Sequence, residues 1–537
     1  MSLGLYKILP HSTLPRGGAE EVGNKAWNLM RMTAEGLPVP AAFVLPTAWC
    51  RRGRPDVDDK DLAEVLSSGI AGLEAATGLG FGSPRRPLLV SVRSGSVVSM
   101  PGMMETVLNI GINAETVGGL IGFTGNPRLA WDCYRRLVQS YAEVVQGLPR
   151  GPFDKLLAQA LSSAGVQAEH ELDHGTLRNL THDLLDRFHE LAGIALPQDP
   201  HEQLRRAAVA VFRSWDAPKA VTYRRVNKIE SDTGTAVTVQ RMVFGNAGGA
   251  SGSGVAFTRN PATGAKELYL DFEFNAQGED IVAGRLAARG DERLRRTRPT
   301  VWTQLEEVGH TLEGIFHDVQ DFEFTLQSGT LHLLQSRSAK RAPWAALRIA
   351  VDQVDEGLIS PSEALSRLAD IEPASVVRTH FAIFDAEPLA HAQVASLGVV
   401  SGAIALDSDT AIRMATAKTP VILVRRETET ADIGGMMSAS GILTGTGSRT
   451  SHAAVVARQL GKVCLVACPD LAIDLNRRVC RIGGKTIHEA EFLSLDGNDG
   501  AIYSGVLEII IERPDRELDR IAAWQASTAN ASLAVPR

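Results

Sequence analysis

Residues 321–337 read DFEFTLQSGTLHLLQSR, with polar and apolar residues alternating on either side of a Gln-Ser-Gly turn. The period of two predicts a β-hairpin in which Asp321 and Glu323 share one strand face, because successive side chains of a strand alternate. Gln335 and Arg337 are expected to share a face of the second strand. Two carboxylates on one face suit Mg²⁺, which prefers oxygen ligands, and an adjacent arginine suits phosphate. A hairpin that exposes its polar face to water shows the same alternation, so the pattern alone leaves both interpretations open.

A second candidate binding segment lies far upstream, where a buried strand at residues 88–92 runs into a glycine- and methionine-rich loop. Because the strand ends at Arg93 and small residues follow, backbone N–H groups of the loop can approach an anion. Lys25 follows a glycine closely and could reach the same phosphates, although a surface lysine is the better interpretation of that residue alone. The loop methionines, Met104 among them, are expected to pack as adaptable hydrophobic side chains.

An acidic pair, Glu279 and Asp280, follows a strand-like stretch and the tripeptide Asn-Ala-Gln at residues 275–277. The two carboxylates are candidates for holding a second metal ion or a ribose. An exposed acidic turn explains the pair equally well, so this assignment also stays open.

A histidine begins a further segment of interest, since residues 447–452 read GSRTSH and precede an apolar run. Small polar residues before such a run predict a helix start, with Thr450 or Ser451 as the capping residue. The N-terminus of a helix offers free N–H groups and positive potential. A neutral imidazole of His452 at that place can attack phosphorus, and the resulting phosphoramidate would be stabilised by those donors. A histidine that simply lies near a helix end is the ordinary alternative.

Composition and charge exclude several classes of protein. The 537 residues include 55 Lys plus Arg and 62 Asp plus Glu, a formal net charge of −7 without basic blocks, which argues against nucleic-acid binding. No run approaches about 18 apolar residues, so no membrane-spanning helix is expected. Five cysteines without a Cys-x-x-Cys pair predict neither a disulfide framework nor a zinc site. Since residues 1–16 show no signal-peptide pattern, the expected protein is reduced and cytoplasmic.

The pattern of helices and strands predicts a mixed α+β and α/β protein of several domains. At roughly 100–200 residues per domain, the length suggests three of them. The predicted segments are an α+β unit at residues 1–340 with a helical insertion at about 127–215, a helical linker at 341–385, a compact β/α domain at 386–510, and a C-terminal tail at 511–537. In this tail, one short amphipathic segment follows Pro514, and the Ala/Ser-rich end is expected to be frayed.

Five separated motifs occur along the chain: VSVRSG (90–95), SMPGMMETVLN (99–109), FTRNP (257–261), NAQGED (275–280) and TSHAAVVAR (450–458). In sequence and in order they resemble the pyruvate phosphate dikinase family, and the likeness runs from about residue 18 to residue 510. The resemblance implies an ATP-grasp nucleotide-binding domain followed by a swivelling β/β/α phosphohistidine domain, with Mg²⁺ as cofactor. In that family, ATP and phosphate phosphorylate a histidine and release AMP and pyrophosphate. The phosphoryl group then passes to pyruvate.

The resemblance assigns a role to each matching residue. It makes His452 the phosphoryl carrier, with Thr450 beside it, and it places Arg337 among the catalytic residues. Arg135 corresponds to a phosphate-contacting arginine of the family. The residues matched to Mg²⁺ are Asp321, Glu323 and Gln335. The residues matched to ATP or phosphate are Lys25, Arg93, Gly102, Met104, Thr106, Arg135, Glu279, Asp280 and Gln335, of which the loop Gly102 to Thr106 would close over the phosphates.

Three departures from the family pattern stand out. Residues 23–26 read GNKA where the family has GGKG, and Val97 occupies the place of a common arginine. Residues 446–449 read TGSR where the family has RGGM, which changes the loop beside the carrier histidine. Arg449 would supply the charge lost at Thr446 or would fit a different acceptor. Unchanged phosphorylation and transfer in Arg449→Met would argue against this hypothesis.

The resemblance leaves the phosphoryl acceptor open. The family continues into a barrel of about 250 residues, whereas 511–537 is all that follows the matched part. The expectation is therefore that the acceptor, pyruvate or another, is supplied in trans by a separate protein domain or as a small molecule, and that phosphoenolpyruvate does not form on this chain alone. The methionine-rich loop favours pyrophosphate over phosphate as second product. A homodimer, a non-catalytic nucleotide-binding regulatory homologue, and a phosphotransferase for a specialised metabolite stay open.

Overall fold

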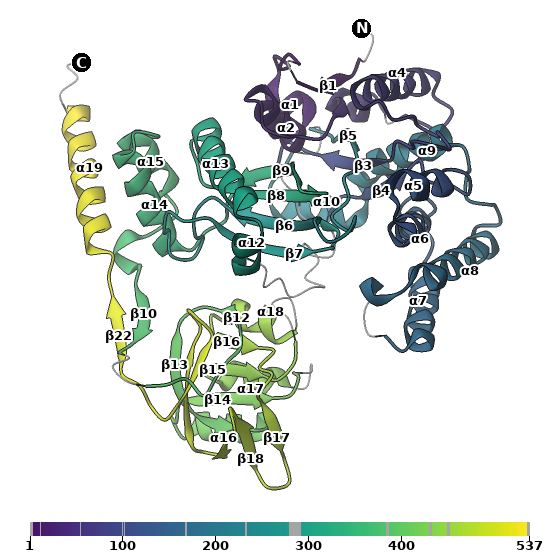
Figure 1. The fold of residues 1–537 in the computed structure, drawn as a ribbon. Helices are drawn as coiled ribbons and strands as arrows, with labels where there is room; N and C mark the ends of the chain where they lie inside the picture. Colours follow the sequence, from purple (N-terminus) through teal and green to yellow (C-terminus); the bar gives the residue numbers. More distant parts are fainter. Residues whose placement is uncertain are drawn as a thin grey trace. The chain divides into compact units, whose positions relative to one another are not determined.

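The computed structural model of the chain contains two compact units. The first holds the described residues up to Lys340 except Asn260–Ala265, and the second holds that short segment and the chain from Arg341 onward. Both combine helices with β-sheets (Figure 1), so the predicted mixed α/β, multidomain class is confirmed. The structure describes all residues except 1–3, 11, 54, 99, 101–102, 167–168, 231–232, 279–290, 383–385, 429–431, 448–451 and 534–537.

The first unit begins with an antiparallel five-stranded sheet. Its strands are β1 (Tyr6–Ile8), β2 (Ala42–Leu45), β3 (Val90–Gly95), β4 (Thr106–Ile110) and β5 (Ala236–Arg241). They lie in the order β1-β2-β5-β3-β4. β3 is buried along nearly its whole length, as predicted for the strand before the methionine-rich loop. The neighbouring helices are α1 (Gly18–Val22), α2 (Asn24–Ala34), α3 (Thr47–Arg51) and α4 (Lys60–Thr77).

A group of helices separates β4 from β5 in the chain and packs beside this sheet (Figure 1). These helices are α5 (Thr116–Thr124), α6 (Pro127–Val144), α7 (Gly151–Ala164), α8 (His174–Ala192), α9 (Pro200–Arg213) and α10 (Pro218–Val226). Asn126, Asp173 and Asp199 start α6, α8 and α9, because each side chain accepts a hydrogen bond from an N–H group of the first turn. The helical pattern that the sequence shows at about residues 127–215 therefore corresponds to helices in the structure.

A second antiparallel sheet completes the first unit. Its strands are β6 (Gly252–Phe257), β7 (Tyr269–Phe274), β8 (Gln320–Gln327) and β9 (Thr330–Ser338), in the order β7-β6-β8-β9. β8 and β9 confirm the predicted hairpin. Ser328 and Gly329 form its turn with φ angles of 52° and 83°, and positive φ at both positions is typical of a type I′ turn. Two helices, α12 (Asp291–Thr297) and α13 (Pro299–Phe316), precede β8, and α13 shares its apolar core.

The second unit contains an eight-stranded sheet in the order β11-β21-β20-β13-β14-β15-β16-β12. Its strands are β11 (Ala390–His391), β12 (Gln393–Ser396), β13 (Val399–Ala405), β14 (Val421–Arg425), β15 (Gly441–Thr444), β16 (Val463–Val466), β20 (Phe492–Asp496) and β21 (Ala501–Ser504). The strands from β13 to β16 are parallel. The helices α16 (Ser408–Thr416), α17 (Ile433–Ser438) and α18 (His452–Gln459) follow β13, β14 and β15, so all three begin at the carboxyl edge of the sheet. A small sheet of β17 (Ala472–Asp474), β18 (Val479–Ile482) and β19 (Lys485–His488) adjoins them.

The remainder of the second unit is a helical group with a two-stranded ribbon. The helices are α14 (Pro343–Asp355), α15 (Pro361–Arg367) and α19 (Asp515–Leu533), and the ribbon pairs β10 (Arg378–Phe381) with β22 (Ile509–Glu512). The amphipathic segment predicted after Pro514 is confirmed as α19, which buries Ile521 and Trp524 against α14 and α15. The helix continues to Leu533, so the expectation of a frayed Ala/Ser-rich end is wrong up to that residue. Within the described part of the chain, no helix is long and apolar enough to cross a membrane.

Candidate functional site

Four polar side chains meet on one face of the β8–β9 hairpin. Asp321 lies opposite Arg337, and Glu323 lies opposite Gln335. Nε and Nη2 of Arg337 donate to Oδ2 of Asp321 over 2.8 and 2.7 Å. Nε2 of Gln335 donates to Oε1 of Glu323 over 3.3 Å. The structure therefore brings together all four hairpin residues that the sequence singles out.

A β-bulge turns the polar residues of β9 to the same face as the two carboxylates. In an unbroken strand, Leu333 and Gln335 would point the same way. The register shifts between Glu323 and Phe324, so that Phe324 pairs with Leu333 and Leu334 is passed over. A bulge of this kind re-aims the side chains that follow it. Leu333 consequently stays in the core with no exposed surface, while Gln335 reaches Glu323.

The first turn of α2 brings Lys25 to the end of β3. Gly23, directly before α2, has a φ of 76°, and a Cβ at that position would lie 2.1 Å from the carbonyl oxygen of Gly95 on β3. Glycine alone tolerates both conditions, because it has no Cβ and adopts positive φ freely. This close approach places Lys25 beside the strand that carries Arg93.

The charges of Lys25, Arg93 and the hairpin act on one another. Burial lowers the pKa of Lys25, the charges of Arg93 and Arg337 lower it further, and Glu323 opposes them. Interactions of this kind require proximity, since the Coulomb energy falls with distance. Three cations and two carboxylates thus face a common region, an arrangement that can bind a polyphosphate together with a divalent metal ion.

The pKa of Asp321 is shifted as well. Burial raises the pKa of this carboxyl above its usual value, against the opposing charge of Arg337, and Glu323 adds to the rise. A neighbouring cation would relieve both effects, because burial and like charge each disfavour the ionised form. The hairpin carboxylates are therefore electrostatically suited to a metal ion.

Mg²⁺ fits the donor atoms of this hairpin. The carboxylates of Asp321 and Glu323 and the side-chain carbonyl of Gln335 offer hard oxygen ligands, and Mg²⁺ commonly takes one or two carboxylates and completes its shell with water and substrate phosphates. Among the described residues, no group of three or more His, Cys, Asp or Glu gathers into a closed metal cage. An open site that shares its metal with a substrate is consistent with that donor set.

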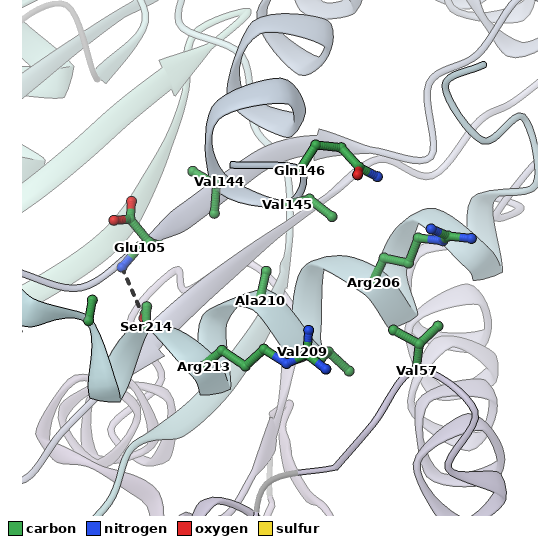
Figure 2. Close-up of a pocket in the computed structure, with 11 residues that line it drawn as sticks. Val57, Glu105, Val144, Val145, Gln146, Arg206, Val209, Ala210, Arg213 and Ser214 are labelled. Carbon is green, nitrogen blue, oxygen red and sulfur yellow. Dashed lines mark hydrogen bonds between the residues drawn. The ribbon is translucent and has the colours of Figure 1, made fainter. Parts of the chain in front are cut away.

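The loop between β3 and β4 is anchored at its end. Arg93 and Thr106 are paired across the two strands. The N–H of Glu105 donates to Oγ of Ser214 over 3.3 Å (Figure 2), and Sδ of Met104 lies 4.0 Å from the same oxygen. Met104 also packs against the core of the unit, which confirms the predicted role of the loop methionines. Thr106 and Met104 thus occupy defined positions next to the strand of Arg93.

A pocket of about 420 Å³ adjoins this anchor, and no hairpin residue lines it (Figure 2). Arg206 and Arg213, which belong to its lining, already pair with carboxylates: Arg206 lies 2.6 Å from Glu202, and Arg213 lies 2.9 Å from Asp56. The other lining residues are Val57, Glu105, Val144, Val145, Gln146, Val209, Ala210, Ser214 and Ala217. The pocket therefore lies beside the anchored end of the loop and away from the hairpin residues. The charged face around the hairpin is the candidate site.

Arg135 lies on α6 inside a cluster of carboxylates. Its Nε and Nη2 donate to Oδ1 of Asp132 over 3.1 and 2.7 Å, and Nη2 also donates to Oε2 of Glu169 over 2.7 Å. Nη1 donates to Oε1 of Gln139, and only 2% of the side chain is exposed. In the described part of the unit, no contact joins Arg135 to the hairpin, and its role toward phosphate stays a prediction.

Several predicted site residues lie outside the described residues, namely Gly102, Glu279, Asp280 and Thr450. α18 begins at His452, as the sequence predicts for the helix that follows the small polar residues. The side chain of His452 is not described.

The sequence did not identify two buried polar residues near Arg135. Asp132 could have been found, because an acid three residues before an arginine on one helix is a common ion pair. Asn246, whose Nδ2 donates to Oδ2 of Asp132 over 3.3 Å, lies in a glycine-rich stretch that carries no comparable signal.

Two family models match the chain. The model described as "Pyruvate phosphate dikinase, AMP/ATP-binding domain" matches residues 54–300, and the model described as "PEP-utilising enzyme, mobile domain" matches residues 417–500. Apart from the short segment Asn260–Ala265, the described part of the first match lies in the unit with the carboxylate hairpin, and the second match lies in the unit with α18. The two matches thus define a two-part class, in which a region similar to an AMP/ATP-binding domain is followed by a region similar to a mobile domain.

Curated relatives give the particular family. The chain is 41% identical over 509 residues to a pyruvate, phosphate dikinase of Clostridium symbiosum, and this alignment covers 94% of the chain and 58% of that relative. It is 40% identical over 533 residues to a pyruvate, phosphate dikinase of Rhizobium meliloti, and this alignment covers 95% of the chain and 59% of that relative. It is 38% identical over 508 residues to a chloroplastic pyruvate, phosphate dikinase of Flaveria trinervia, with 94% of the chain and 53% of that relative covered. The chain belongs to the pyruvate phosphate dikinase family, and it spans somewhat more than half the length of these relatives.

Proposed function

We propose that the chain is an ATP-dependent phosphotransferase of the dikinase type. ATP, together with phosphate, would phosphorylate His452 and release AMP and pyrophosphate, and the phosphoryl group would pass to pyruvate or to another acceptor. The observation that carries the proposal is the convergence of Lys25 and Arg93 with the carboxylates of the β8–β9 hairpin. This convergence fits an ATP-grasp domain, in which a nucleotide binds between two antiparallel sheets.

Each residue of the charged face has a distinct task in this proposal. Asp321 and Glu323, assisted by Gln335, would hold Mg²⁺, which neutralises phosphate charge when bound. Lys25, Arg93 and Arg337 would bind phosphate oxygens and stabilise the charge that develops in phosphoryl transfer, where positioning and electrostatics dominate. Those matched residues that lie beyond the described part are proposed to act as the family resemblance implies: the loop of Gly102 over the phosphates, Glu279 and Asp280 near the nucleotide, and Thr450 beside the carrier.

The reaction can be followed through its phosphorus atoms. If AMP leaves, the bond between the α and β phosphates breaks and His452 receives the β and γ phosphates. Transfer of the γ phosphate to inorganic phosphate then yields pyrophosphate and leaves the β phosphate on His452. Label from β-labelled ATP should therefore remain on the protein in acid-labile form, and label from γ-labelled ATP should leave as pyrophosphate when phosphate is added. Intact ATP binding without any protein label would overturn the catalytic proposal and favour a nucleotide-binding regulatory protein.

Binding of MgATP is expected to depend on pH through Asp321. The raised pKa of this carboxyl keeps a proton on it at a higher pH than an exposed aspartate would, and the proton competes with the metal ion. Calorimetric titration with MgATP from about pH 8 down to about pH 5 should show affinity falling as the pH drops, above the ordinary aspartate range near 4. Asp321→Asn should bind weakly with little further change over this range. A pH dependence equal in both proteins would contradict the assignment.

Gly23→Ala is expected to impair ATP binding by displacing the first turn of α2. The new Cβ would lie 2.1 Å from the carbonyl oxygen of Gly95, so Lys25 must move away from Arg93. Gly36→Ala is the matched control, because Gly36 has nearly the same φ, 77°, but no atom within 4 Å of the added Cβ. Gly36→Ala should lose about 1–2 kcal/mol of stability from its positive φ. Gly23→Ala should lose more, because Gly23 combines a φ of 76° with a ψ of 154°, a region that essentially only glycine adopts. Only Gly23→Ala should lose ATP affinity, by roughly tenfold or more. Equal ATP affinities in the two variants would refute this geometry.

A further inference from the structure

The two sheets of the first unit are joined by a crossover that is tied to the tip of the hairpin. The crossover, residues 242–251, runs from the end of β5 to the start of β6. The N–H of Phe244 donates to Oε1 of Gln327 over 2.9 Å. At the other end, the N–H of Gly329 donates to the carbonyl of Ala250 over 2.9 Å. A movement of the crossover would therefore move the hairpin.

A buried amide, Asn246, holds the crossover in place. Its Nδ2 donates to Oδ2 of Asp132 on α6 over 3.3 Å, and its Oδ1 accepts from Nε2 of Gln277 over 3.3 Å. The exposed fractions are only 3% for Asn246, 2% for Asp132 and 5% for Gln277. One chain of buried hydrogen bonds thus joins α6, the crossover and the loop after β7, and a buried polar group that loses its partner is costly.

Asp132 is the charged end of this chain of hydrogen bonds. Its Oδ1 accepts from Arg135, and its Oδ2 accepts from Nε of Arg136 over 3.0 Å. Burial alone would raise the pKa of Asp132, but the charges of Arg136 and Arg135 outweigh burial and hold the pKa below its usual range. The carboxylate is therefore ionised, and it offers Asn246 a charge-assisted and hence stronger acceptor.

Direct backbone packing leaves Asn246 little freedom to find other partners. A Cβ on the preceding Gly245 would lie 2.1 Å from the carbonyl oxygen of Ala276 and 2.3 Å from Oγ of Ser253. The crossover thus contacts both the loop after β7 and the first residues of strand β6. The backbone that carries Asn246 is therefore packed directly against both segments.

We propose that Asn246 is a positioning residue for the ATP site described above. Asp132, Asn246 and Gln277 form what we name the crossover clamp. By holding the crossover, the clamp holds the hairpin carboxylates at a fixed separation from the cations on α2 and β3. The inference rests on the proposed function, because the clamp would serve nucleotide binding by preventing displacement of the site residues. A displacement of only about 1 Å can cost on the order of 10²-fold in rate.

The kinetic test replaces Asn246 by leucine, a side chain of similar size without hydrogen bonds. Asn246→Leu is expected to lower kcat/KM for ATP in histidine phosphorylation by roughly 10- to 100-fold, mainly through a higher KM. Asn227→Leu is the matched control, because Asn227 is exposed and, among the described residues, its side-chain amide donates only to the carbonyl of Tyr223 on α10. The control should keep the wild-type KM.

A distance measurement tests the clamp without any nucleotide. All five cysteines are buried, so cysteines introduced at exposed Ser68 on α4 and Gln304 on α13 should take spin labels selectively. α4 belongs to the core of the first sheet and α13 to that of the second. The label-to-label distribution should be narrow in the labelled parent and in Asn227→Leu, and shifted or broader in Asn246→Leu.

Gln277→Met supplies a milder variant that removes one of the two hydrogen bonds of Asn246, and it decides the matter if Asn246→Leu does not fold. In a double variant, the two effects on KM should be clearly less than additive, since both act on one clamp. Unchanged KM and unchanged distances in folded variants would overturn the proposal, and so would a stability loss alone. If the wild-type chain binds no ATP while the distances still broaden, the proposed function fails and the clamp stands.

Discussion

His452→Asn is expected to abolish acid-labile labelling of the protein while ATP binding persists. Asparagine has no nucleophilic ring nitrogen, so phosphorus cannot be captured at this position. The chain starts α18 at residue 452, where the free N–H groups of a helix terminus favour a phosphorylated side chain. Protein-bound label from β-labelled ATP should therefore fall to background, which is the largest effect that we predict.

The control for this variant is His488→Asn in the same unit. His488 is exposed on β19, away from the start of α18 in the chain, and its replacement should leave labelling at the wild-type level. ATP binding by calorimetry should be unchanged in both variants, because the first unit is untouched. Label that survives in His452→Asn, or vanishes in both variants, would remove His452 from the role of carrier.

Glu323→Gln and Asp321→Asn are expected to slow phosphorylation of His452 by about 10²- to 10³-fold each. Each substitution replaces one carboxylate of the proposed Mg²⁺ site by a neutral amide. The Mg²⁺ concentration that gives half-maximal rate should rise, and added Mg²⁺ should restore part of the rate in Glu323→Gln. Rates measured by rapid quench over a range of Mg²⁺ concentrations check both effects.

Thermal unfolding of each variant separates these rate effects from a loss of folding. The side chain of Arg337 is 42% exposed and that of Asp321 is 8% exposed, so their ion pair is only partly screened by water. Glu307→Gln, on the exposed face of α13, serves as the matched control and should keep the wild-type rate and Mg²⁺ dependence. If Glu323→Gln shared the Mg²⁺ dependence of this control, the hairpin would not be the metal site.

Local patterns in the sequence were sufficient for the individual elements of the site. Alternation over residues 321–337 predicted the β8–β9 hairpin, and its Ser-Gly turn adopts the two positive φ angles that a tight hairpin requires. The start of α18 at His452 followed from the small polar residues before an apolar run. The sequence predicted only a short amphipathic segment after Pro514, whereas α19 runs to Leu533, because Ile521 and Trp524 pack against helices that are distant in the chain.

By itself, the sequence determined which side chains carry charge, which strand they occupy and which family the motifs resemble, because these properties depend on neighbours along the chain. Only the tertiary structure decided that Lys25 lies beside Arg93, since this needs the backbone contact of Gly23 with Gly95. It also decided that Gln335 faces Glu323, because the β-bulge reverses an alternation that points the other way. Both outcomes depend on pairing between distant segments, and such pairing is set by packing and register rather than by local periodicity.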